Sequence, residues 1–107
     1  MAVRALVQVP KAVRRGEVFE VRTTLAHPME TGYRRDSGGR MLPRDIVRTL
    51  EVRLAGERVF AADLHPAIAA NPFFAFTLVA NAGGPLEIRW VGDNGFVHTE
   101  TVTLVVT

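Results

Sequence analysis

The pattern that most restricts the fold of this chain is an alternation of apolar and polar residues with a period of two, interrupted by Gly, Pro and Asn. It is clearest in residues 18–25, where one face of an extended chain would carry Phe19, Val21, Thr23 and Leu25. Successive side chains of a strand point to opposite faces of a sheet, so this spacing indicates strands with one buried face. The sequence therefore predicts an all-β protein.

The alternation recurs along the chain and predicts about seven short strands. We expect them over residues 2–9, 18–25, 46–54, 57–62, 73–80, 86–91 and 96–106. Pro10 ends the first strand, Gly92-Asp-Asn-Gly95 is typical of a hairpin, and residues 64–70 are the one stretch with room for a helical turn. This pattern is typical of an Ig-like antiparallel β-sandwich, formed as a single domain over residues 1–107.

Strand spacing also predicts where the aromatic residues lie. Trp90, Phe74 and Phe76 follow the buried face and are expected in the core. Phe73 and Val91 fall on the opposite face. Strands that are apolar on both faces indicate a covered outer surface, and hence an interface with a partner.

Composition excludes several classes of function. The 13 basic and 11 acidic residues are mixed along the chain and give a net charge of +2, which argues against a nucleic-acid footprint. The absence of cysteine excludes disulfides, thiolate metal sites and thiol nucleophiles. No stretch has the length of a membrane-spanning helix, and the first ten residues do not resemble a signal peptide.

Two connections are longer than a hairpin needs, residues 26–45 and 63–72. Long loops in small domains tend to carry function, so we expect the functional surface there. The candidate partner-contact residues are His27, Met29, Glu30, Arg34, Arg44, Asp63, His65 and Asn71.

Several residues of the chain could bind a metal or an anion or take part in catalysis, and each also has a purely structural interpretation. His27, Asp63 and His65 are nitrogen and oxygen ligands that suit zinc, but residues beside prolines more often satisfy turns, and no compact metal motif is present. The arginines of residues 26–45 suit oxyanions, whereas the nearly balancing acids favour internal ion pairs. His98 is expected to be a half-buried strand residue without a charged partner nearby in sequence. Ser37, the only serine, has no arrangement for nucleophilic catalysis.

Three stretches are more specific than the rest. They are His27-Pro-Met-Glu-Thr-Gly32 with the following Arg34, Asp36, Gly39 and Pro43-Arg44; Asp63-Leu-His-Pro-Ala-Ile-Ala-Ala-Asn-Pro72; and, more weakly, Trp90-Val-Gly-Asp-Asn-Gly95. Val9-Pro10-Lys11 and Gly16-Glu17 agree with them. Together they resemble the SoxZ family of bacterial thiosulfate oxidation over essentially the full length, although at Gly92 that family more often carries a polar residue.

The resemblance implies a non-catalytic subunit without a cofactor. It implies a heterodimer with SoxY, whose mobile tail carries sulfur intermediates on a cysteine while SoxAX loads thiosulfate, SoxB removes sulfate and SoxCD oxidises the remaining sulfur. This chain would support SoxY and help dock it to those enzymes. The resemblance also implies a periplasmic location, reached in the folded state with a SoxY that bears the export signal.

Two other functions remain as alternatives. Small Ig-like sandwiches also serve as protein-binding modules of other pathways. A small metal-binding protein using His27, His65 and Asp63 is the other alternative. Whichever function holds, the isolated chain has its partner surface uncovered and is expected to form a homodimer through that surface.

Overall fold

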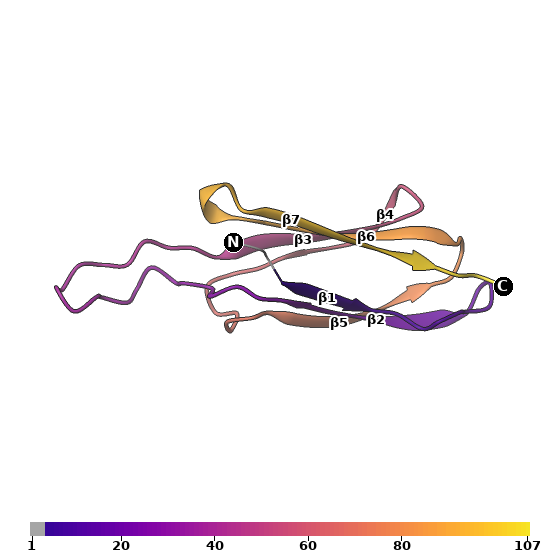
Figure 1. Ribbon diagram of the computed structural model, residues 1–107, viewed down its shortest axis with the longest axis horizontal. Helices are drawn as coiled ribbons and strands as arrows, with labels where there is room; N and C mark the ends of the chain where they lie inside the picture. Colours follow the sequence, from indigo (N-terminus) through magenta and orange to yellow (C-terminus); the bar gives the residue numbers. More distant parts are fainter. Residues whose placement is uncertain (1–3) are drawn as a thin grey trace.

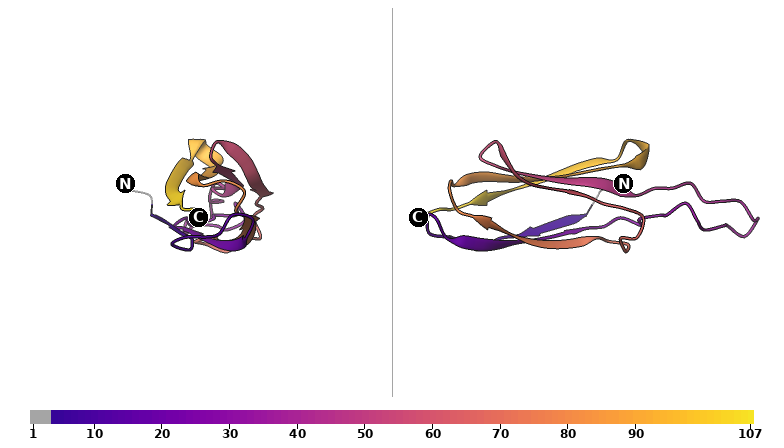
Figure 2. Two further views of the ribbon diagram at one scale, coloured as in Figure 1. Left: turned by 90° about the vertical axis from the view of Figure 1, so that its right-hand side faces the viewer. Right: turned by 180° about the vertical axis from the view of Figure 1, so that it is seen from behind.

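Two antiparallel sheets pack face to face in the computed structural model, which describes residues 4–107 (Figure 1). Within these residues the strands are β1 (Ala5–Gln8), β2 (Val18–Leu25), β3 (Val47–Leu54), β4 (Glu57–Asp63), β5 (Phe73–Val79), β6 (Gly84–Gly92) and β7 (Val97–Leu104). The single-turn 3-10 helix η1 (Asp93–Gly95) joins β6 to β7. The two layers are separate when the molecule is seen end-on and from behind (Figure 2).

One sheet has the order β1-β2-β5 and the other the order β4-β3-β6-β7, with neighbouring strands antiparallel. This arrangement confirms the predicted Ig-like sandwich. A short parallel bridge between Val13 and Val106 lies outside the named strands.

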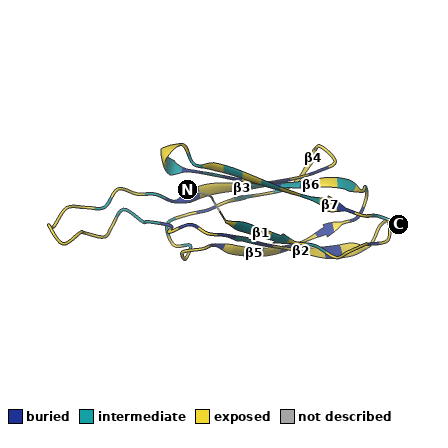
Figure 3. Cartoon of the chain, viewed as in Figure 1, coloured by how far each residue is buried: buried dark blue, intermediate teal, exposed yellow. Residues whose placement is uncertain are grey.

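The core lies between the sheets and follows the predicted alternation. In β2, Phe19, Val21, Thr23 and Leu25 are all buried, while their neighbours in sequence are more exposed (Figure 3). Trp90 is completely buried, and Phe76 is buried and stacks on Phe60, which confirms their expected places. Phe74 is half-buried at the margin of the core.

Some local expectations were wrong. Residues 64–70 form a turn closed by the Ile68 N–H donating to the His65 carbonyl at 3.0 Å, rather than a helical element. His98 does have a charged partner, since its Nε2 lies 2.8 Å from Glu100 Oε1. Residues two apart on a strand share a face, so Glu100 was in reach after all. Residues 2 and 3 of the first predicted strand lie outside the described residues.

The connection over residues 26–45, expected to be a long loop, is an extended hairpin that projects from one end of the sandwich (Figure 1). We call it the arm. Glu30 and Asp45 exchange two backbone hydrogen bonds of 2.8 Å, and further out the Leu42 N–H donates to the Arg34 carbonyl at 2.8 Å. These bonds make the arm a two-stranded ribbon, and the molecule reaches 58 Å along its longest axis. Among the residues described, none forms a helix suited to crossing a bilayer.

Candidate functional site

The arm is shaped by its own side chains from tip to base. At the tip, Asp36 Oδ1 accepts hydrogen bonds from the N–H groups of Gly38 and Arg40, at 2.9 and 3.0 Å, which closes the turn. Nearer the base, Arg34 forms an ion pair with Glu30, four residues earlier on the same strand of the arm, and lowers the pKa of that carboxyl. The predicted internal ion pairing of the arm is confirmed for these two residues.

Gly32 allows the two strands of the arm to approach each other. Its φ is +86°, and a Cβ added there would lie 3.0 Å from the Cβ of Arg44 on the returning strand. Positive φ and a close neighbour both favour glycine. This gives a physical reason for the glycine that ends the stretch His27-Pro-Met-Glu-Thr-Gly32.

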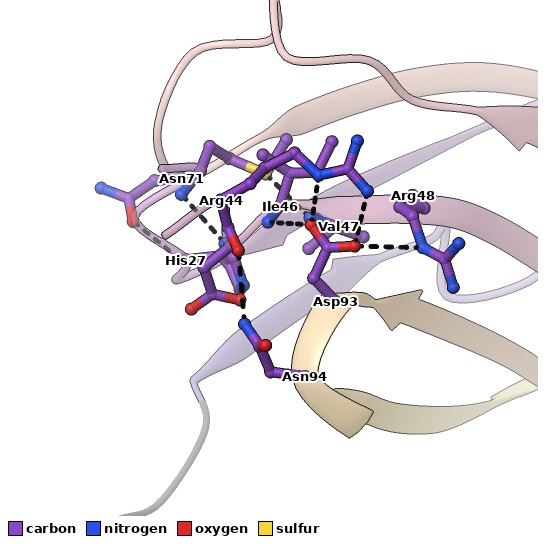
Figure 4. Close-up of polar contacts among 10 residues, drawn as sticks. His27, Arg44, Ile46, Val47, Arg48, Asn71, Asp93 and Asn94 are labelled. Carbon is purple, nitrogen blue, oxygen red and sulfur yellow. Dashed lines mark hydrogen bonds and ion pairs between the residues drawn. The ribbon is translucent and has the colours of Figure 1, made fainter. Parts of the chain in front are cut away.

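His27 and Asn71 tie the arm to the connection over residues 63–72. The His27 N–H donates to Asn71 Oδ1 at 3.0 Å, and the Asn71 N–H donates to the His27 carbonyl at 2.7 Å (Figure 4). Asn71 has a φ of 52°, a left-handed conformation that asparagine tolerates better than most residues. The two long connections, distant in sequence, are therefore joined at one point.

The His27 side chain is buried at the centre of this junction. It is 5% exposed, its Nδ1 accepts the Met29 N–H at 3.0 Å, and its ring meets the edge of Phe96 with centroids 5.0 Å apart. Burial lowers the pKa of the imidazole, and the nearby carboxylates of Asp45 and Asp93 oppose this in part. The acceptor role of Nδ1 places the proton of the neutral ring on Nε2, which lies 3.8 Å from Asp45 Oδ1.

Met29 completes the buried part of the junction. It is 4% exposed and has a φ of 51°, which is unusual for a residue with a long side chain. Its sulfur accepts the N–H of Val47 at 3.3 Å, where β3 begins. The strained backbone at Met29 thus places its buried side chain against the first residue of β3.

Asp93, in the β6–β7 hairpin, binds residues of the returning strand of the arm and holds that strand against the hairpin (Figure 4). Arg44 donates to both of its oxygens, Nε to Oδ2 at 2.8 Å and one terminal nitrogen to Oδ1 at 2.9 Å. The Ile46 N–H donates to Oδ2 at 3.2 Å, and Arg48 Nε lies 3.4 Å from Oδ1. The hydrogen bonds from Arg44 are the largest cause of the lowered pKa of the Asp93 carboxyl.

In this chain the same hairpin is packed so that position 92 has no room for a Cβ. A Cβ added to Gly92 would lie 2.5 Å from the Ile46 carbonyl oxygen, closer than real Cβ atoms approach. Next to it, the Asp93 N–H donates to that same carbonyl at 2.9 Å. Gly92 therefore lets the hairpin lie directly against the chain leaving the arm.

We call the set His27, Met29, Arg44, Arg48, Asn71 and Asp93 the arm base. Asp63 and His65 lie beside it, exposed, and line a shallow hollow together with Arg44, Arg48 and Leu64. His27 is not part of the hollow. Within residues 4–107, no three His, Cys, Asp or Glu side chains gather in a way that would hold a metal ion.

The structure places the eight candidate contact residues in two groups. His27 and Met29 are buried in the isolated chain and hold the arm in place. The others line the arm and its base with side chains that reach the surface to differing degrees: Glu30, Arg34, Arg44, Asp63, His65 and Asn71.

Sequence reasoning missed two residues of the arm base, Asp93 and Arg48, and also missed Phe96, whose ring contacts His27. Asp93 was noticed only as part of a turn. The available signal was the resemblance around Trp90-Val-Gly-Asp-Asn-Gly95, which marked this hairpin without giving it a role.

Comparison with known protein families gives a match over nearly the whole chain. The model of the family described as "Sulphur oxidation protein SoxZ" matches residues 7–103, nearly the whole chain. A search of curated protein sequences finds no match to this chain.

Among solved structures, the superoxide reductase (neelaredoxin) from Ignicoccus hospitalis is similar, with a TM-score of 0.74 and 18% identity over 98% of this chain and 82% of that one. The reduced superoxide reductase from Archaeoglobus fulgidus has a TM-score of 0.63 and 17% identity over 94% of this chain and 88% of that one. The sulfur carrier protein SoxY from Chlorobium limicola f thiosulfatophilum has a TM-score of 0.65 and 12% identity over 96% of this chain and 78% of that one. At these identities the similarity concerns the fold alone.

Proposed function

Since this chain belongs to the SoxZ family of sulphur oxidation proteins, we propose that it is the SoxY-binding subunit of the SoxYZ sulfur carrier. The family match over residues 7–103 is the observation that carries the proposal. The chain contains no cysteine, so the thiol that bears sulfur would be supplied by SoxY. In this division of labour the chain is not an enzyme.

We assign two physical roles to the subunit within the complex. It stabilises SoxY by covering apolar sheet surface that would otherwise face water. Its arm helps to dock the loaded complex to the enzymes SoxAX, SoxB and SoxCD. An arm held by the contacts of His27, Asn71 and Asp93 presents its polar surface in one orientation, which lowers the entropy lost on docking. The complex acts in the periplasm, exported with a SoxY that bears the signal.

Co-purification tests the SoxY-binding role. The untagged chain is expressed beside tagged SoxY from the same organism, and the mass and stoichiometry of the eluted species are measured. We expect a stable one-to-one complex. If both proteins are folded and elute separately, the proposal is wrong.

The docking role has a separate test, because the arm lies apart from most of the sandwich. Arg34 is exposed at the side chain and lies on the arm. We expect Arg34→Glu to leave the complex with SoxY intact and to lower thiosulfate turnover in a reconstituted system. The matched control is Arg22→Glu, an exposed arginine on β2. Unchanged turnover with Arg34→Glu would contradict the role.

A further inference from the structure

β5 differs from the other strands that lie at the sides of the two sheets. Its sequence, Phe-Phe-Ala-Phe-Thr-Leu-Val, contains no charged residue and no proline, and it pairs with β2 without a register shift. In the described part of the chain β2 is its one partner. Long, uncharged, regular edge strands of this kind are templates for pairing with another chain.

The other three edges of the described sandwich each carry a feature that disfavours strand addition. β1 has four residues. β4 has charges at both ends, Glu57, Arg58 and Asp63, and a register shift against β3. β7 turns the ion pair of His98 and Glu100 toward the inside of the sandwich. Short length, charge, bulges and inward-facing charge are the devices by which edge strands avoid pairing.

The hydrogen bonds at the two ends of β5 show which backbone groups face outward. The Leu25 N–H donates to the Pro72 carbonyl at 3.1 Å, and the Ala80 N–H donates to the Glu17 carbonyl at 2.8 Å. Backbone groups of alternate residues in an antiparallel strand point to opposite sides. The even-numbered residues of β5 therefore face β2, and Phe73, Ala75, Thr77 and Val79 direct their N–H and C=O groups away from it.

We call these four residues the β5 edge. Within residues 4–107, one hydrogen bond reaches their outward groups, from the Asn81 N–H to the Val79 carbonyl at 2.9 Å. Their side chains lie on the outer face of the sheet and are all exposed. Beside them a groove runs between β5 and β4. Its lining includes Val18, Val59 and Val79, which are 62%, 38% and 45% exposed, and, on the β4 side, the charged Glu57 and Arg58.

We propose that the β5 edge is the surface on which SoxY binds, by adding an uncharged edge strand of its own to the β1-β2-β5 sheet. A row of outward N–H and C=O groups can pair with the backbone of an extended chain that adds to the sheet edge. The absence of charge on β5 calls for an uncharged strand opposite it. The solved SoxY from Chlorobium limicola has the same fold, so a protein of that kind brings sheet edges of similar form. This inference rests on the proposed function, which supplies SoxY as the partner.

Proline at an outward position tests the inference while sparing the ladder with β2. Thr77→Pro removes an N–H that has no partner within the described residues, so the chain should still fold. The bond from the Gly92 N–H to the Phe96 carbonyl, 2.9 Å, fixes the same alternation on β7, where Thr101 points outward and is exposed. Thr101→Pro is therefore a matched control on a different edge.

A second pair of variants avoids any doubt about folding. Val79→Lys places a charge on the β5 edge, and Val97→Lys does the same on β7, where Val97 is 50% exposed. All four variants are checked by circular dichroism, and their affinity for tagged SoxY is measured by titration.

We expect Thr77→Pro and Val79→Lys to weaken SoxY binding at least about tenfold, and both β7 controls to stay within about twofold of the wild type. If the wild type binds SoxY and the folded β5 variants bind equally well, the inference is overturned while the proposed function stands. If the chain forms a homodimer through β5 that SoxY does not displace, the inference is also overturned. If the wild type does not bind SoxY at all, both fail.

Discussion

At the arm base, Asp93 accepts hydrogen bonds from Arg44 and from the backbone of Ile46, and His27 and Asn71 satisfy each other. Along the β5 edge, a row of backbone groups points into solvent. Both surfaces are built from extended chain. The polar groups named at the arm base have hydrogen-bond partners within the chain, whereas most outward backbone groups of the β5 edge have none among the described residues. The arm base can hold its shape without help, whereas the β5 edge gains hydrogen bonds and apolar contact when a partner covers it.

Gly92→Ala should have the largest effect on the arm base. A Cβ there would lie 2.5 Å from the Ile46 carbonyl oxygen, so the backbone must move. We expect the free energy of unfolding to fall by about 1–3 kcal/mol, the usual range for overpacking. Gly38→Ala at the arm tip, with its nearest neighbour at 3.4 Å, is the control. Urea denaturation measures both, and equal stability of the two variants would contradict the close packing of the hairpin.

Replacing Asn71 should have the next largest effect and separates two causes. Asn71→Gly removes the acceptor of the His27 N–H but tolerates a φ of 52°, and should lower the free energy of unfolding by about 1 kcal/mol. Asn71→Ala also adds strain in the left-handed region, so it should be worse by about another 1 kcal/mol. The two variants are compared by urea denaturation. A less stable glycine variant would show that the conformation of residue 71 is misassigned.

Acid should weaken the arm base through His27. Burial lowers the pKa of this imidazole below its ordinary value of 6.5, so the unfolded chain binds more protons between the two pKa values. The stabilisation due to neutral His27 is full above 6.5 and is lost as pH falls from there to the folded pKa. We expect His27→Gln to show a flatter fall in stability over this range, and the exposed His65→Gln to follow the wild type. Identical slopes for all three proteins would show that His27 titrates normally.

The smallest effect on the isolated chain is expected at the β5 edge. Thr77→Lys changes an exposed side chain, so the free energy of unfolding should stay within about 0.5 kcal/mol of the wild type. Self-association at high concentration should fall, because a charge on an edge strand opposes pairing. Sedimentation measures this directly. If Thr77→Lys destabilises the fold and leaves self-association unchanged, the β5 edge serves folding rather than pairing, which would contradict the contrast with the arm base.

The part of this fold that depends on local patterning could be predicted from the sequence. Alternation placed Phe19, Val21 and Trp90 in the core because period two determines which face of a strand is buried. The arm could not be predicted, because its ribbon depends on backbone bonds such as that between Leu42 and Arg34, which leave no apolar pattern.

The candidate site was predictable by region but not by residue. Long connections marked the right part of the chain, while the role of Asp93 depends on Arg44, 49 positions away. The β5 edge was visible in part, since Phe73 stood out as apolar on the outer face. Which side of β5 lacks a neighbour depends on strand order, and strand order is set by the whole sheet.

Hydrogen exchange of the β5 amides, with and without SoxY, tests the central claim most directly. In the isolated chain the outward amides of Phe73, Ala75 and Thr77 should exchange fast, and the amides of Phe76 and Leu78, which face β2, should exchange slowly. In the complex with SoxY the account predicts that the outward amides become as slow as the inward ones, while those of Thr99 and Thr101 on β7 are unchanged. Outward β5 amides that stay fast in a stoichiometric complex would contradict it.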